Sequence, residues 1–274
     1  MAKSVSVSTP CVVFVVWGDK YVAEVPRCID RSPGIAGYPI VLITDLDTVV
    51  PDLIGVDVVR ADFQLTGHFR KSEMWRFLPQ GHDDFIYLDT DITVVGDITF
   101  GIDKARQHGI AMVHSNSYLL DQFKTFADVM REEGVEPRGM AQHNTGVVFF
   151  SRTPSVNKVF TTWQELCEKY SPREGVGRLT DQPFFSLAME LVGHVPYTLV
   201  KNFNYRPNRD PVLGPIRIWH RWHDAPKDLN YHTETWRKFD YKRDAMVPLV
   251  KPRPLRTKIR RLTRTVARRL GLRK

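Results

Sequence analysis

The stretch from Phe85 to Thr99, FIYLDTDITVVGDIT, constrains the fold more than any other part of the chain. It begins with an apolar run, which is typical of a strand buried on both faces of a sheet. Asp89 and Asp91 follow where that strand should end, and carboxylates two residues apart point to the same side of an extended segment. Buried carboxylates repel each other without a counter-charge, and oxygen ligands favour Mg²⁺, Mn²⁺ or Ca²⁺ over zinc. We therefore expect a strand that ends in a divalent-metal site, the alternative being a capping Asp followed by a solvated turn Asp.

Similar apolar runs recur along the first half of the chain. They lie at residues 11–17, 40–44, 56–59, 85–88 and 110–113. Most are continuous and not alternating, which indicates a mostly parallel sheet covered by helices. We expect helices over 21–32 and 67–78, the second stopped by Pro79. This alternation predicts an α/β sandwich with ligands at the carboxyl ends of the strands.

The second half of the chain is less regular. Apolar residues at helical spacing predict a helix over 155–170, and weaker patterns predict helices over 122–133 and 182–192. The run 147–150 is a short candidate strand. We expect one catalytic domain over residues 1–250, followed by a separate tail.

The tail, residues 251–274, holds eleven of the 39 Lys and Arg residues and none of the 31 acidic ones, so the rest of the chain is slightly acidic. Its apolar residues form one helical stripe. They are Leu255, Ile259, Leu262, Val266 and Leu270. A basic amphipathic helix of this kind predicts binding to an anionic membrane surface. A nucleic-acid contact or a solvated tail is the alternative, and a nucleic-acid partner is not expected.

The cysteines bear on the compartment. Cys11, Cys28 and Cys167 are odd in number and widely spaced, which fits neither a disulfide framework nor a zinc site and favours a reducing compartment. The run 11–17 is too short to span a bilayer, and no cleavage site for a signal peptide follows it, so we interpret it as the first strand.

The context YLDTDITVVGDI, with the Asp-x-Asp at 89–91, resembles the GT-A glycosyltransferases, and family 8 in particular. Three later segments resemble motifs of the same family, in the same order. They are Asn144-Thr145-Gly146-Val147, Asp181-Gln182, and Ile218-Trp219-His220. The resemblance extends over residues 11–230 and implies the GT-A fold, with a mostly parallel central sheet flanked by helices.

The resemblance also implies roles for single residues. Asp89, Asp91 and His220 would bind Mn²⁺ or Mg²⁺. A second group would contact the nucleotide-sugar donor: Trp17, Asp19, Tyr21, Lys71, Thr90, Asn144, Thr145 and Gly146. The residues themselves also permit plainer roles, because Lys71 could be a solvated helix lysine, Asn144 and Thr145 could form a turn, and Asp181 could begin a helix.

The segment after His220 departs from the family pattern. The usual His-x-x-Gly-x-x-Lys-Pro-Trp ending is replaced by residues 220–228, HRWHDAPKD. A phosphate contact by Lys227 is therefore one residue out of register, and Arg221 is the alternative. His223 is a rival to His220 as the metal ligand.

These expectations describe a metal-dependent enzyme that moves a hexose from a UDP-sugar to a glycan or lipid-linked acceptor. The resemblance favours retention of configuration, with Gln182 near the anomeric carbon, whereas an inverting enzyme could use Asp181 as the base. We expect a cytoplasmic protein, peripheral at the inner face of a membrane. The alternative is a non-catalytic membrane- or nucleic-acid-binding protein on a decayed transferase fold.

Overall fold

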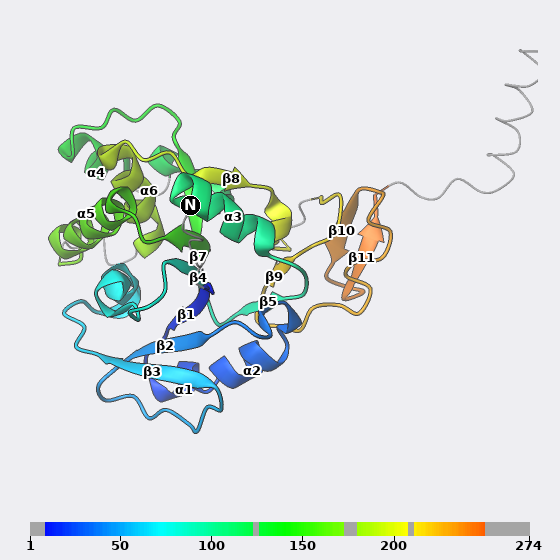
Figure 1. Ribbon diagram of the computed structural model, residues 1–274. Helices are drawn as coiled ribbons and strands as arrows, with labels where there is room; N and C mark the ends of the chain where they lie inside the picture. Colours follow the sequence, from blue (N-terminus) through cyan, green and yellow to red (C-terminus); the bar gives the residue numbers. More distant parts are fainter. Residues whose placement is uncertain (1–8, 123–125, 173–179, 208–210, 250–274) are drawn as a thin grey trace, which may run out of the picture. The chain divides into compact units, whose positions relative to one another are not determined.

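The computed structural model describes residues 9–122, 126–172, 180–207 and 211–249 (Figure 1). The chain divides into two compact units, the first made of Met1–Pro207 and Ile216–Ala225 and the second of Asn208–Pro215 and Pro226–Lys274. The predicted amphipathic tail at 251–274 lies outside the described residues. Within the described part, no helix combines the length and the apolar character that a membrane span requires.

Seven described strands of the first unit form one sheet in the order β3-β2-β1-β4-β7-β6-β8. Their bounds are β1 Cys11–Val15, β2 Ile40–Asp45, β3 Val56–Ala61, β4 Asp84–Leu88, β6 Ile110–Leu119, β7 Ala141–Ser151 and β8 Tyr197–Leu199. Strand β1 is parallel to β2 and β4, β2 to β3, and β6 to β8. The predicted mostly parallel sheet is confirmed.

Strand β7 is the exception, because it runs antiparallel to both β4 and β6. Leu88 at the end of β4 is paired with Val147 of β7. The first half of β7 therefore lies at the same edge of the sheet as the carboxyl ends of β1 and β4. The prediction of a strand at 147–150 missed this half, whose polar residues hid the strand signal.

Helices cover both faces of the sheet (Figure 1). Their bounds are α1 Asp19–Val22, α2 Val25–Asp30, η1 Pro33–Ile35, η2 Gly67–Phe77, α3 Thr99–His108, η3 Leu120–Gln122, α4 Phe126–Glu132, α5 Pro154–Tyr170, α6 Asp181–Val192 and η5 Lys201–Phe203. Val13 and Val15 of β1 belong to the apolar cluster formed with η2, α5 and α6. Phe14 belongs to the opposite cluster, formed with α2 and α3. The strand is thus buried on both faces.

Three predicted helices differ from the structure. The helix expected over 21–32 is wrong as a single element, because the chain forms two short helices there. Pro26 lies in the first turn of the second helix, where the N–H that proline lacks would have no partner within the helix. The helix expected over 67–78 is a 3₁₀ helix that ends before Pro79. The helix expected over 122–133 is represented by α4, while residues 123–125 lie outside the described residues. Helices α5 and α6 agree with prediction to one residue.

A small two-stranded sheet of the first unit sets up the site. Strand β5 (Ile92–Val94) pairs antiparallel with β9 (Ile218–His220), with Ile92 opposite His220. This pairing carries a residue from late in the sequence to the loop that holds Asp89 and Asp91.

The second unit contains a hairpin of β10 (Arg237–Asp240) and β11 (Ala245–Pro248). The buried guanidinium of Arg237 donates to the carbonyl oxygens of Leu229, Tyr231 and Gly214, at 2.6 to 2.7 Å. These hydrogen bonds tie three loop carbonyls of the unit to the hairpin.

Candidate metal centre

Asp89, Asp91 and His220 converge at the edge of the sheet. One ligand atom from each lies within 4.8 Å of the others, and His220 Nε2 is 3.3 Å from Asp91 Oδ1. The convergence expected from the sequence is observed, but its cause differs. The two carboxylates sit in the tight turn between β4 and β5, and not on an extended strand. The turn, together with the β5–β9 pairing, brings the three side chains together.

Gly146 makes this close approach possible. Its carbonyl oxygen accepts a hydrogen bond from the Asp89 amide at 2.9 Å. A Cβ at this position would overlap the His220 ring at Cε1 and would lie 2.9 Å from Asp89 Oδ2. The glycine is therefore needed because the Asp89 carboxylate and the His220 imidazole pack directly on its backbone.

Asp89 is held as a carboxylate by two donors on one of its oxygens. Lys71 Nζ lies 2.6 Å from Oδ1, and the Tyr87 hydroxyl donates to the same oxygen at 2.5 Å. Burial alone would raise the pKa of Asp89, but the charges of Lys71 and His220 and these hydrogen bonds outweigh it and lower the pKa. Burial would lower the pKa of Lys71, yet Asp89 holds it well above its ordinary value. Oδ2, which faces Gly146, is the oxygen left for a metal.

Asp181 begins helix α6 and is 3 % exposed. Burial, with a contribution from the charge of Asp89, raises its pKa even though Lys71 acts in the opposite direction. Its Oδ2 accepts from the Thr145 hydroxyl at 3.1 Å, and the Thr145 amide donates to Gln182 Oε1 at 3.4 Å. The residue that precedes the helix as its cap is Thr180, so Asp181 lies inside the first turn.

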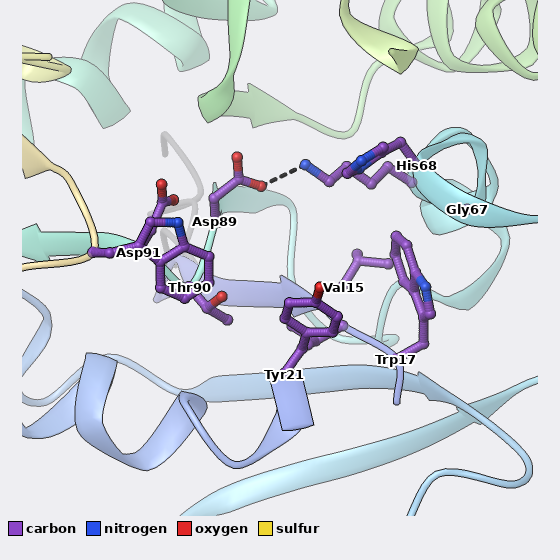
Figure 2. A pocket seen from close by; sticks show the side chains of 11 residues that line it. Val15, Trp17, Tyr21, Gly67, His68, Asp89, Thr90 and Asp91 are labelled. Carbon is purple, nitrogen blue, oxygen red and sulfur yellow. Dashed lines mark hydrogen bonds and ion pairs between the residues drawn. The ribbon is translucent and has the colours of Figure 1, made fainter. Parts of the chain in front are cut away.

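A cavity of about 440 Å³ opens beside the metal-site residues (Figure 2). This volume falls within the range of ordinary small-molecule sites. Its lining residues are Val15, Val16, Trp17, Tyr21, Gly67, His68, Lys71, Asp89, Thr90, Asp91 and Trp222. In Figure 2, Trp17 and Tyr21 follow β1, Asp91 lies across the cavity from Trp17, and the dashed line at Asp89 marks its ion pair with Lys71. Asp89 and Asp91 of the candidate metal cluster thus lie in the cavity wall.

Six of the predicted site residues line this cavity, and the others do not. The lining residues are Trp17, Tyr21, Lys71, Asp89, Thr90 and Asp91. Asp19 is exposed and accepts a hydrogen bond from the Val49 amide at 2.8 Å, which closes a neighbouring loop. Asn144 is buried and accepts from the Gly146 amide and from Asn204.

The two alternatives after His220 also have defined places. His223 is exposed, and its carbonyl oxygen accepts a hydrogen bond from the Trp219 indole. Its side chain is not part of the cluster formed by Asp89, Asp91 and His220. Arg221 is half-buried and does not line the cavity. Lys227 belongs to the second unit.

Several residues of the site gave no signal in the sequence. Arg31, at the end of α2, donates to the carbonyl oxygens of Thr90 and Ile92 at 3.0 and 3.3 Å and so holds the metal-site turn. Asn204 contacts His220 at 2.7 Å. His68 and Trp222 line the cavity. Only the expectation that buried metal ligands have polar partners would have directed attention to Asn204.

Comparison of the sequence with protein-family models gave no match, and neither did comparison with curated proteins. Solved structures are similar in fold. The galactosyltransferase LgtC in complex with donor and acceptor sugar analogs matches with a TM-score of 0.56 at 16 % identity, covering 81 % of this chain and 92 % of that one. An active-site mutant of LgtC matches with a TM-score of 0.53 at 15 % identity and the same coverage. The glycosyltransferase GlyE of Streptococcus pneumoniae matches with a TM-score of 0.50 at 16 % identity, covering 84 % of this chain and 58 % of that one.

These matches, together with the strand order and the Asp-x-Asp turn at the end of β4, define the class of fold. The first unit has the GT-A fold, an α/β sandwich with a mostly parallel sheet. The fold class expected from the sequence is confirmed.

Proposed function

We propose that this protein is a metal-dependent glycosyltransferase that takes a hexose from a nucleotide-diphosphate sugar. The observation that carries the proposal is the cluster of Asp89, Asp91 and His220, whose two carboxylates line a cavity of about 440 Å³. A strand-end cap and a solvated Asp would not bring a buried imidazole to within 3.3 Å of a carboxylate.

The donor set fits a divalent cation. Two carboxylates and one imidazole suit Mn²⁺ or Mg²⁺, with coordination positions left for phosphate oxygens. Bound there, the cation would neutralise the charge that develops on the departing diphosphate. The Lys71 ammonium is a second positive charge at the cavity. It is paired with Asp89, which raises the pKa of Lys71 and keeps it protonated.

We assign the donor as a UDP-sugar, which Trp17, Tyr21 and Thr90 would contact. Trp17 and Tyr21 give the cavity aromatic faces on which a base can stack, and Tyr21 is 49 % exposed. LgtC, which shares the fold, was crystallised with donor and acceptor sugar analogs. That neighbour supports a nucleotide-sugar donor and a glycan acceptor for this chain.

We propose retention of configuration, with Gln182 near the anomeric carbon. Thr145 holds the carboxamide of Gln182 and the carboxylate of Asp181 from the same strand. One fold neighbour is a structure in which an active-site glutamine of LgtC was mutated, which supports a role for a glutamine in such a site. The burial of Asp181 argues against its use as a base for an incoming acceptor.

The acceptor is proposed to be a glycan or lipid-linked sugar at the inner face of a membrane. The support is the charge of residues 251–274, with eleven basic residues and no acid. Electrostatic attraction of about 1 kcal/mol for each basic residue near an anionic surface would be enough for peripheral binding.

The test is a screen of nucleotide-sugars for hydrolysis with Mn²⁺, Mg²⁺ or chelator, using wild type and Asp91→Asn. The proposal expects turnover of a UDP-hexose that requires metal and is lost in Asp91→Asn, and NMR of a transfer product should show the donor's anomeric configuration. Metal-independent turnover, or undiminished turnover by folded Asp91→Asn, would overturn it. Absence of turnover and of UDP binding in the wild type would favour the non-catalytic alternative.

A further inference from the structure

The two ring nitrogens of His220 have different partners. Nε2 lies 3.3 Å from Asp91 Oδ1, on the side where a metal would bind, and Nδ1 lies 2.7 Å from Asn204 Oδ1. The imidazole is 6 % exposed. Only a nitrogen without a proton can bind a metal, so the proton of the neutral ring must be on Nδ1 for this ligand to act.

The hydrogen bonds around the ring determine which nitrogen carries the proton. The Gly146 amide, which can only donate, lies 3.0 Å from an Asn144 side-chain atom, which must therefore be the oxygen. The same oxygen accepts from Asn204 Nδ2 at 2.8 Å. The other end of the Asn204 amide is then its oxygen, and it faces His220 Nδ1. Nδ1 must therefore donate, so in the neutral ring the lone pair is on Nε2.

The opposite orientation of the Asn204 amide would leave this network unsatisfied. It would point Asn204 Oδ1 at the oxygen of Asn144, and two acceptors would face each other without a proton. Asn144 and Asn204 are each 3 % exposed, so water is poorly placed to repair the mismatch. The network therefore selects one tautomer of His220.

The backbone keeps Asn204 beside the ring. Asn204 follows the 3₁₀ turn η5, and the next residue, Tyr205, bridges to β9. The Tyr205 amide donates to the Ile218 carbonyl at 2.9 Å, and the His220 amide donates to the Tyr205 carbonyl at 3.0 Å. The contact between Asn204 and His220 is thus fixed by main-chain pairing on both sides.

We propose that Asn204 is a positioning residue that, oriented by Asn144, locks His220 in the tautomer able to bind the metal. This inference rests on the proposed function, because it assigns the control of that same metal site. It also gives Asn144 a role in building the site from within. Loss of such an outer partner typically weakens metal binding 10- to 100-fold.

The experiment titrates Mn²⁺ alone into wild type, Asn204→Ala and Asn204→Asp, by calorimetry and by the EPR signal of free Mn²⁺. Asn204→Ala removes the acceptor for Nδ1 and should weaken binding about 10- to 100-fold. Asn204→Asp keeps the acceptor for Nδ1 and loses only the hydrogen bond to Asn144, so it should bind Mn²⁺ nearer to wild type than to Asn204→Ala. The matched control is Asn157→Ala, which removes an exposed asparagine on α5 and should leave binding unchanged.

A second measurement needs no variant. Long-range ¹H–¹⁵N NMR of the metal-free wild type, at a pH where the imidazole is neutral, should show the His220 proton on Nδ1. A proton on Nε2, or equal binding by wild type and Asn204→Ala, would overturn the inference while leaving the proposed function intact. A wild type that binds neither Mn²⁺ nor Mg²⁺ would remove the proposed function and the inference with it.

Discussion

Replacement of Gly146 by alanine tests how tightly the metal centre is packed. The added Cβ would lie 2.9 Å from Asp89 Oδ2, where ordinary contacts begin at 3.4 Å, so the carboxylate must withdraw by about 0.5 Å. The His220 ring must move as well. The backbone cannot absorb the change easily, because the Gly146 carbonyl and amide are both hydrogen-bonded. Metal–ligand distances tolerate only about 0.2 Å.

The expected loss of Mn²⁺ affinity is about 10- to 100-fold, by analogy with disturbed ligand positioning. At a Mn²⁺ concentration of about 100 times the wild-type Kd, the metal stabilises the wild type by about 2.7 kcal/mol. The same concentration should stabilise Gly146→Ala by only about 0.4 to 1.4 kcal/mol. Chemical unfolding with and without Mn²⁺ measures both values.

The control is Gly55→Ala, since Gly55 has a φ of +74° and nothing lies within 4 Å of its added Cβ. It should lose about 1 to 2 kcal/mol of stability from the left-handed backbone and keep the full Mn²⁺ effect. If Gly146→Ala were stabilised by Mn²⁺ as strongly as the wild type, the ligand assignment would be wrong.

Three further changes address other parts of the molecule. Arg31→Ala should weaken Mn²⁺-dependent UDP binding about 10-fold, because it removes the hydrogen bonds that hold the turn between β4 and β5. The control is Arg27→Ala, which loses only exposed ion pairs and should bind UDP like the wild type. Equal calorimetric affinities of wild type and Arg31→Ala would refute the role of Arg31. Burial, aided by His114, lowers the pKa of His143 to about 4, so the unfolded state takes up a proton first and stability should fall as the pH drops from about 6.5 to 4. His143→Gln should lose less stability over that interval in urea unfolding, and an identical loss would contradict this. Deletion of residues 251–274 should abolish sedimentation with anionic liposomes and leave UDP-sugar hydrolysis unchanged. Sedimentation of the deletion variant would contradict the membrane proposal. So would a full-length protein that binds RNA tightly but does not bind liposomes.

The sequence was most informative where function depends on contiguous residues. The apolar run before Asp89 predicted a strand buried on both faces, and β4 has that environment. The convergence of His220 with the two carboxylates was expected through the family resemblance. The structure supplies the cause, which is the pairing of β5 with β9.

Other features depend on contacts between distant segments, and no local pattern encodes them. The reversed strand β7 contains a polar first half, in which the amides of His143 and Thr145 donate to side chains of α6 and Asn144 accepts from Asn204. Arg31 and Asn204 look like ordinary surface residues in the sequence, and only the fold places them beside carbonyl groups and a ring nitrogen. The break between α1 and α2 is a local feature, but the prediction treated residues 21–32 as one helix.

Calorimetric titration of UDP into the full-length protein, with Mn²⁺ and with chelator, tests the central claim most directly. If Asp89, Asp91 and His220 hold a metal that binds the donor diphosphate, UDP should bind at least about 10-fold more tightly with Mn²⁺, a difference of about 1.4 kcal/mol. Asp91→Asn should abolish that difference. Equal UDP affinity with and without Mn²⁺, or tighter binding of GDP or CMP than of UDP, would contradict the account.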